Sequence, residues 1–373
     1  MDYQTVAQGA CEKIEEAVSR FLVNGEPQEC RRYGNGHIND TFLLCTGEAG
    51  EERGRYILQR MNTDVFKDPK GLMGNVSGVT KYLREQIIKS GGNPDRETLT
   101  LVKTEDGLDY YVDSIGSWWR MYLFIADATG YDAVEREEDF YQSAKAFGHF
   151  QRLLDQYPVE KLTETIPDFH NTPKRFEAFV RAVREDAMGR ADKVRAEIAF
   201  VMDREKDMAV VTDKLKRGEI PCRVTHNDTK LNNILLDDRT KEALCVIDLD
   251  TIMPGTAVFD FGDSIRFGAN TAAEDETDLS KVSLSLSLYE TYTRGFLAGC
   301  GGSLTAAELE MLPWGARLMT LECGMRFLTD YLEGDHYFRI HRPDHNLDRA
   351  RTQLALVEDM ERKWEEMKVK YCL

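Results

Sequence analysis

The sequence CRVTHNDTKLNNILLDDRTKEALCVIDLD, residues 222–250, is the stretch that decides the fold. Two apolar runs, NILL and LCVI, flank the polar turn DDRT, a pattern that predicts a β-hairpin. Asp228 and Asn233 stand at the start of the first run, and Asp248 follows the second. Because a hairpin brings its two ends together, we expect these three oxygen-bearing side chains to converge on one spot.

The same stretch has the spacing of a kinase catalytic loop. His226 precedes Asp228 by two residues, and Asn233 follows it by five. In such a loop Asp228 accepts or orients the proton of an attacking hydroxyl, while His226 braces the loop. Asn233 and Asp248 would ligate Mg²⁺ that bridges the nucleotide phosphates, and Asp250 is a candidate for an acid that supports the metal ligands or binds a second metal. The alternative interpretation is an acidic loop built of cap and turn residues.

A second acidic motif follows downstream. The sequence DFG at 260–262 spells the metal-binding motif of protein kinases. Spacing argues against that role, because Asp248 directly follows a strand of the hairpin whereas Pro-Gly precedes Asp260. We therefore predict that Asp248 ligates the metal and that Asp260 hydrogen-bonds loop backbone. Asp263 and Arg266 are expected to pair on the helix that this motif opens.

The chain before residue 126 predicts a β-rich lobe. We expect helices over 1–23 and 72–89, and strands over 55–60, 98–103, 108–113 and 118–125, with 98–103 and 108–113 joined as a hairpin. After residue 126 the composition shifts towards helices, over 137–156, most of 173–217, and 276 to the end. The sequence therefore predicts an α+β fold with two lobes, 1–125 and 126–373.

Four residues of the first lobe are candidates for nucleotide contacts. Gly34 and Gly36 lie in a turn whose backbone N–H groups can approach phosphates, although an ordinary Gly-rich turn is the alternative. Arg60 ends a strand where a kinase-like lobe places its phosphate-pairing Lys, with Gln59 as a substitute and solvent exposure as the alternative. Tyr122, in the strand 118–125, is also assigned to the nucleotide site.

Charge and composition exclude several classes of partner. The net charge of −17 argues against nucleic acids and anionic membranes, since both are polyanions. It leaves phosphate chemistry open because Mg²⁺ can supply positive charge locally. No stretch approaches the ~20 apolar residues of a spanning helix, and the N-terminus lacks the features of a signal peptide. The eight cysteines are scattered singly, which is typical of reduced thiols, and we expect a cytoplasmic protein.

These motifs resemble those of the aminoglycoside phosphotransferase and choline kinase superfamily of small-molecule kinases. Within it, the sequence is most similar to kinases that act on N-acetylated hexoses. The stretches that carry the resemblance are GNGHINDT (34–41), ILQRMN (57–62), VFKDP (65–69), HNDTKLNN (226–233), VIDLDTIMPG (246–255), DFGDSIRFG (260–268) and LECGMRFLTDYL (321–332).

The resemblance implies a bilobal, protein-kinase-like fold with ATP and Mg²⁺ as co-substrates. It implies transfer of the γ-phosphoryl group to the anomeric hydroxyl of an N-acetylhexosamine, with Asp228 as the base and with Arg326 and Tyr337 lining the sugar pocket. Two alternatives stay open at this point. One is a kinase of the same fold for an amino alcohol or an aminoglycoside, which the tail carboxylates of residues 330–335 leave possible. The other is a nucleotide-binding regulator without turnover.

Overall fold

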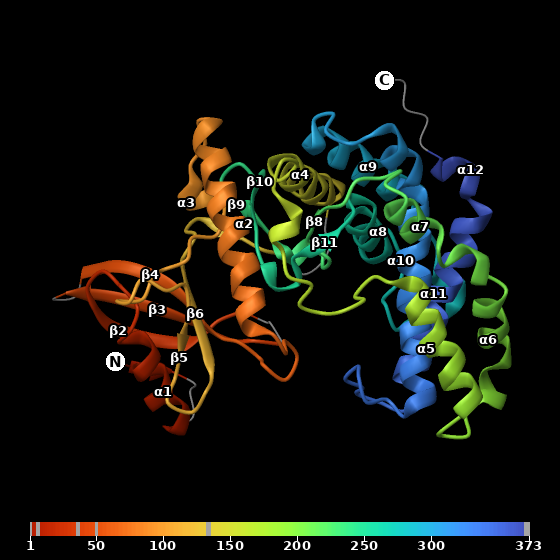
Figure 1. Ribbon diagram of the computed structural model, residues 1–373, viewed down its shortest axis with the longest axis horizontal. Helices are drawn as coiled ribbons and strands as arrows, with labels where there is room; N and C mark the ends of the chain where they lie inside the picture. Colours follow the sequence, from red (N-terminus) through yellow and green to blue (C-terminus); the bar gives the residue numbers. More distant parts are fainter. Residues whose placement is uncertain (1, 5–7, 35–37, 49–50, 132–135, 369–373) are drawn as a thin grey trace. The chain divides into compact units, whose positions relative to one another are not determined.

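A computed structural model describes residues 2–4, 8–34, 38–48, 51–131 and 136–368 (Figure 1). They form two compact units that interleave along the chain. The first unit comprises the described parts of 1–129 together with 156–167 and 235–253, and the second comprises the described parts of 130–155, 168–234 and 254–373. The first is rich in strands and the second in helices, which confirms the predicted α+β fold with a small β-rich lobe and a larger helical lobe. The proposed lobe boundary at residues 125/126 stays a prediction.

The first unit is built on a six-stranded sheet of order β1-β2-β3-β4-β6-β5. Its outermost pair, β1 and β2, is parallel, and the remaining pairs are antiparallel. Helix α1 (Gln8–Val18) contributes Ile14, Ala17 and Val18 to an apolar core with buried side chains of the sheet. The strands are β1 (Asp2–Gln4), β2 (Glu26–Arg32), β3 (Asp40–Glu48), β4 (Glu51–Arg60), β5 (Tyr111–Val112) and β6 (Trp118–Leu123).

Helix α2 (Pro69–Lys89) joins the later pieces of the first unit to the sheet-bearing part. Asp68 begins it by accepting a hydrogen bond from Gly71 N, and a proline occupies the first turn, where no amide donor is needed. Asn75 on this helix donates to the carbonyls of Thr163 and Ile252. The short helix α3 (Pro94–Glu97) follows.

Two predictions for this region were wrong in part. The expected helix over 1–23 is shorter, because residues 2–4 form a strand instead. The expected hairpin of 98–103 with 108–113 does not form. The amide of Val102 donates to Met121 O, and the carbonyl of Lys103 accepts from Leu22 N, so the backbone of 98–103 is bonded to other partners. A propensity pattern cannot reveal such distant pairings.

The central hairpin is confirmed. Strands β9 (Ile234–Asp237) and β10 (Ala243–Val246) pair around the predicted turn, where Asp237 Oδ1 accepts from the amides of Arg239 and Thr240. Strand β7 (Ala128–Thr129), which the sequence did not predict, adds to β9 as a third strand. The structure therefore supplies the rigid element that the sequence placed between Asn233 and Asp248.

The second unit is mainly helical (Figure 1). None of the described helices is long and apolar enough to cross a membrane. Two short strands, β8 (Arg223–Thr225) and β11 (Met253–Gly255), pair beside the catalytic loop. The α-helices are α4 (Glu137–Leu153), α5 (Thr172–Glu185), α6 (Arg195–Met202), α7 (Val210–Lys216), α8 (Ala257–Gly268), α9 (Leu286–Cys300), α10 (Ala306–Glu333), α11 (His345–Arg362) and α12 (Trp364–Met367). The 3₁₀ helices of the chain are η1 (Val159–Lys161), η2 (Ala191–Val194), η3 (Glu205–Asp207), η4 (Leu231–Asn233), η5 (Leu249–Thr251) and η6 (Leu279–Lys281).

Helices α8 and α10 pack at backbone contact. A Cβ atom on Gly262 would lie 2.2 Å from Gly315 O, and one on Gly315 would lie 2.2 Å from Val258 O. Neither position has room for a side chain. Between them and α9, the buried Phe261 ring makes edge contacts with Tyr292 and other aromatic rings. This core fixes α8, whose first turn faces the catalytic loop.

Candidate active site

Asp228 lies in the loop between β8 and η4, with both carboxylate oxygens engaged. Asn233 Nδ2 donates to one oxygen at 2.9 Å and to Asp228 O at 2.7 Å, and Lys230 Nζ lies 2.8 Å from the other oxygen. Burial would lower the pKa of Lys230, but the Asp228 carboxylate outweighs this effect and raises it. Because the amide nitrogen of Asn233 is used within the loop, its side-chain oxygen is the atom that can ligate a metal.

The loop is held from beneath by Asp260, in the first turn of α8. Its carboxylate accepts from His226 N at 2.9 Å, from Asn227 N at 2.8 Å and from Gln151 Nε2 at 2.9 Å. Asp260 is 1% exposed, and burial raises its pKa. Asn227 has a left-handed backbone conformation with φ of 65°, and the bonds from His226 N and Asn227 N to Asp260 hold it in that conformation. The prediction that Asp260 serves the loop backbone is confirmed.

Two further contacts complete the support of the loop. The buried His226 ring makes edge contacts with Phe147, and its Nδ1 accepts from Asp228 N at 3.3 Å, which agrees with the predicted bracing role. Asp263 accepts from Thr229 N and pairs with Arg266 at 3.0 Å, as predicted. Burial would raise the pKa of Asp263, but nearby cations lower it.

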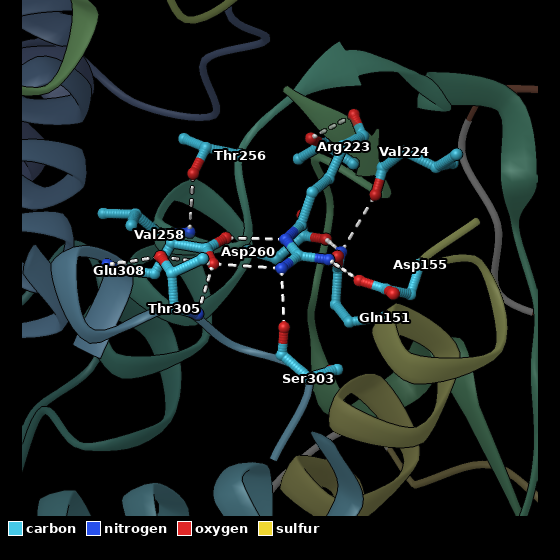
Figure 2. Close-up of polar contacts among 11 residues, drawn as sticks. Gln151, Asp155, Arg223, Val224, Thr256, Val258, Asp260, Ser303, Thr305 and Glu308 are labelled. Atoms are coloured by element: carbon cyan, nitrogen blue, oxygen red, sulfur yellow. Dashed lines mark hydrogen bonds and ion pairs between the residues drawn. The ribbon is translucent and has the colours of Figure 1, made fainter. Parts of the chain in front are cut away.

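Behind the loop, Arg223 of β8 is the centre of a buried ion cluster (Figure 2). Its Nε and Nη2 bind the two oxygens of Glu308 at 2.6 and 3.0 Å, its Nη1 binds Asp155 at 2.5 Å, and Nη2 also donates to Ser303 O at 2.8 Å. Figure 2 also shows Gln151 bridging Val224 O and Asp260. No sequence pattern signals this cluster, because its members are far apart in the chain.

Asp248 and Asp250 lie in the first unit, at the end of the hairpin. Asp248 directly precedes η5, is exposed and has a φ of 57°, a conformation that turns the chain sharply after the strand. Asp250 is instead buried against Arg120, whose Nη1 lies 2.5 Å from it, and accepts from Asn39 Nδ2 at 2.6 Å. A buried guanidinium therefore occupies the Asp250 carboxylate, and the role of Asp250 as an acid that supports the metal ligands or binds a second metal stays a prediction.

Arg120 was not singled out from the sequence. Its Nε donates to Gln59 Oε1 at 2.9 Å, and its guanidinium lies 5.4 Å from the Tyr122 ring. Burial would lower the pKa of Arg120, but Asp250 reverses this and raises it. Tyr122 is 4% exposed, and burial raises its pKa, so its ring packs inside the unit.

The remaining nucleotide candidates lie at the sheet. Arg60 ends β4 and pairs with Asp40 through its Nε at 2.9 Å, so Glu85, considered as its partner from sequence, is not the partner. Burial would raise the pKa of Asp40, but Arg60 and Arg32 lower it. Gly34 has a φ of 74°, and Gly36 lies outside the described residues.

Arg326 and Tyr337 are neighbours in the second unit. The Arg326 guanidinium faces the rings of Phe169, Tyr337 and Phe338 at 5.8, 5.7 and 5.4 Å, and its Nη2 lies 3.4 Å from Tyr337 Oη. Tyr337 is 68% exposed, so its face is open to a ligand. Within the second unit the structure brings together Asp228 with Asn233, and Arg326 with Tyr337. The convergence of Asp248 with Asn233 stays a prediction.

Comparison with known proteins gives the class. The model of the APH phosphotransferase enzyme family matches residues 29–284, more than half of the chain. Three solved structures are similar over nearly the whole length. An aminoglycoside phosphotransferase from Alicyclobacillus acidocaldarius has a TM-score of 0.60 at 12% identity, with 97% of each chain covered. A microcompartment-associated aminopropanol kinase has a TM-score of 0.57 at 16% identity, covering 96% of this chain and 99% of its own. A spectinomycin phosphotransferase in complex with ADP and spectinomycin has a TM-score of 0.57 at 12% identity, covering 97% and 100%.

The fold and the loop thus define a phosphotransferase with a kinase-like architecture. The chain belongs to the APH phosphotransferase enzyme family and is a small-molecule kinase. Because the identities to the solved structures are low, those similarities establish the fold alone, and the acceptor has to be argued from this chain's own residues.

Proposed function

We propose that the protein is an N-acetylhexosamine 1-kinase, which transfers the γ-phosphoryl group of ATP to the anomeric hydroxyl of N-acetylglucosamine or N-acetylgalactosamine. The observation that carries this proposal is the charge of the region around Arg326. It favours an uncharged acceptor over the cationic acceptors of other small-molecule kinases.

Two arginines of this region have no carboxylate partner. Among the described residues, neither Arg175 nor Arg326 forms an ion pair, although most arginines of this acidic protein do. Burial and the charge of Arg326 lower the pKa of Arg175. An ammonium-bearing acceptor would meet repulsion here, whereas hydroxyl and carbonyl oxygens would find donors.

Two of the tail carboxylates, Asp330 and Asp335, are not available to a polycation. Asp330 accepts from the backbone amides of residues 336–338 and from Asn346 Nδ2. Asp335 pairs with Arg190 at 2.7 Å and also accepts from Asn346. Both carboxylates therefore hold the loop that carries Tyr337, which weakens the aminoglycoside alternative.

Asp228 has the environment of a hydroxyl-orienting base. Asn233 and Lys230 fix its carboxylate, and the intermediate exposure of Asp228 leaves it accessible to an acceptor hydroxyl. In this mechanism Asp228 holds the anomeric hydroxyl in line and takes its proton as the phosphoryl bond forms. Most of the acceleration comes from positioning and from electrostatics.

The donor set fits Mg²⁺. The described residues contain no group of three or more His, Cys, Asp or Glu side chains that could hold a metal ion alone. Mg²⁺ does not need one, because it binds through one or two protein oxygens together with substrate phosphates and water. Asn233 and Asp248 offer such oxygens, and the ion would neutralise charge on the transferred phosphoryl group. Use of ATP is supported by the kinase family and by the ADP bound in the spectinomycin phosphotransferase.

The test of the base is Asp228→Asn. We expect kcat to fall by roughly 10³-fold or more, since general base catalysis and orientation are both lost, while ATP binding measured by calorimetry stays within about twofold. Asp213→Asn, at a half-buried position of α7, is a matched control for loss of one carboxylate in the same unit. Near-normal turnover by the purified Asp228 variant would overturn the assignment.

The acceptor is tested by product analysis. Both N-acetylhexosamines, glucose, ethanolamine, choline and an aminoglycoside are each incubated with labelled ATP, and the phosphorylated position is determined by NMR. We expect a 1-phosphate from the N-acetylated sugars. Preferential phosphorylation of an amino alcohol or an aminoglycoside would contradict the proposed acceptor, and ATP binding without any turnover would favour the regulator.

A further inference from the structure

His170 makes one well-defined polar contact and lacks another. Its Nδ1 lies 2.8 Å from Glu322 Oε1, and the second oxygen of Glu322 accepts from Thr172 Oγ1 at 2.6 Å. Burial would raise the pKa of Glu322, but His170 and its other partners lower it, so the carboxylate is ionised. An ionised carboxylate only accepts, and Nδ1 must therefore carry the proton.

The second ring nitrogen of His170, Nε2, accepts a hydrogen bond in a neutral imidazole and donates one in an imidazolium. This atom is buried, and no group among the described residues forms a hydrogen bond to it. A buried polar atom without a partner destabilises the fold. Such an atom needs an explanation, and a ligand that forms a hydrogen bond with it is one.

A second unsatisfied group lies on the same segment of the fold. Arg175 Nε is buried without a hydrogen-bond partner, while its Nη2 donates to Phe169 O at 3.3 Å. Phe169 precedes His170, and their rings are 4.6 Å apart. Two buried polar atoms without partners thus belong to residues that contact Phe169.

These groups lie between the sugar-binding candidates and the support of the catalytic loop. Arg326 faces the Phe169 ring, and Glu322 lies one turn before Arg326 on α10. On the other side, the His170 ring is 5.3 Å from the ring of Phe259, the neighbour of Asp260. A ligand that contacts Arg326 and Phe169 would be close to His170, whose ring lies 4.6 Å from the Phe169 ring.

We propose that His170 is a specificity-determining residue, whose Nε2 forms a hydrogen bond with a hydroxyl or acetamido group of the uncharged acceptor. This inference rests on the proposed function, because it assigns a contact to the sugar. Glu322 holds the His170 ring through Nδ1, and Arg175 supplies a donor to an oxygen of the same ligand. An acceptor that offers both a donor and an acceptor group, such as an N-acetylated sugar, satisfies both residues. A quaternary ammonium alcohol does not.

The experiment compares three substitutions of His170 in the full-length enzyme. His170→Phe keeps the ring and removes both nitrogens, His170→Gln places an amide near the position of Nε2, and His170→Asn places one near Nδ1. For the sugar that the wild type phosphorylates best, we expect kcat/KM to fall roughly 10- to 100-fold in the Phe and Asn variants, mainly through KM, and to recover in part in the Gln variant. The KM for ATP should stay within about twofold.

Thr172→Val is the matched control, because it removes the other hydrogen bond of Glu322 and leaves Nε2 intact. A series of sugars that each lack one hydroxyl or the acetamido group identifies the sugar group that bonds to His170. Removing that group should lower kcat/KM in the wild type and leave kcat/KM nearly unchanged in His170→Phe.

Unchanged kcat/KM in His170→Phe, or an equal loss in all three variants and in Thr172→Val, would overturn the inference. If the wild type phosphorylates neither N-acetylhexosamine, the proposed function fails separately. In that case kcat/KM of the His170 variants is measured with the acceptor that the wild type does phosphorylate, and the two outcomes above overturn the inference in the same way.

Discussion

Replacing Arg223 with methionine should destabilise the second unit by about 3–5 kcal/mol, the usual cost of removing one partner from a buried ion pair. Arg223 makes four hydrogen bonds, two of them to Glu308, whose side chain is fully buried. Methionine has a similar length and fills similar space, so the change isolates charge and hydrogen bonding. Glu308 would keep only its contacts with Thr305 in the capping box of α10.

The coupling between the two residues can be measured directly. Arg223→Met/Glu308→Leu removes both buried charges, so the loss should be smaller than the sum of the two single losses by at least about 2 kcal/mol. Glu308→Gln keeps the shape and the capping contacts and should cost about 1–2 kcal/mol. Each of these values is a difference in the free energy of unfolding between two variants.

Urea unfolding followed by circular dichroism at the helix band suits this measurement, because the second unit carries most of the helices. The midpoint should fall while the slope with denaturant stays constant. If Arg223→Met unfolds within about 1 kcal/mol of the wild type, or if the double variant shows additive losses, the buried cluster does not stabilise the unit in the way argued here.

Three other predictions address the loop, acid stability and helix packing. Asp260→Asn should lower kcat roughly 10- to 100-fold with ATP affinity nearly unchanged. The amide N–H of the new side chain would face a backbone N–H of the loop, where the carboxylate now accepts a hydrogen bond. An unchanged kcat in steady-state kinetics would contradict this prediction. Burial would raise the pKa of Asp359, but Lys363 and other donors lower it to about 2. The ionised carboxylate therefore stabilises the folded protein by about 2 kcal/mol above about pH 4, and this contribution is lost as the pH falls to about 2. The difference in unfolding free energy between wild type and Asp359→Asn should shrink over that window, and a constant difference would refute the linkage. Gly262→Ala should destabilise by about 1–3 kcal/mol, whereas Gly74→Ala, with nothing near its Cβ position, should be neutral or mildly stabilising in thermal unfolding.

The sequence was most informative where partners lie close together in the chain. The hairpin of β9 and β10 was predicted because its two runs and its turn are contiguous. The scaffolding role of Asp260 was predicted because the spacing from the hairpin argued against the metal role, and the structure supplies the bonds to the backbone of the loop. These features depend on local rules, which a single sequence contains.

Distant pairings escaped prediction for a physical reason. Arg120 and Asp250 are far apart in sequence, and each looks like an ordinary polar residue in its own segment. The same is true of Arg223 with Glu308, and of His170 with Glu322. Burial of a charge is a property of the fold, so only a polar residue inside an apolar run, as Arg120 is in WWRMYL, gives a hint.

The packing of α8 against α10 bears on how kinase-like sequences are read. The letters at 260–262 match a metal motif, yet each residue has a separate structural role. Asp260 accepts from loop amides, the Phe261 ring is buried in the core, and Gly262 lacks the side chain that would block the contact between α8 and α10. Contacts within the second unit thus explain each of the three letters. A motif scan that weighs letters without asking what each residue contacts will assign a metal to an aspartate that is buried against loop amides.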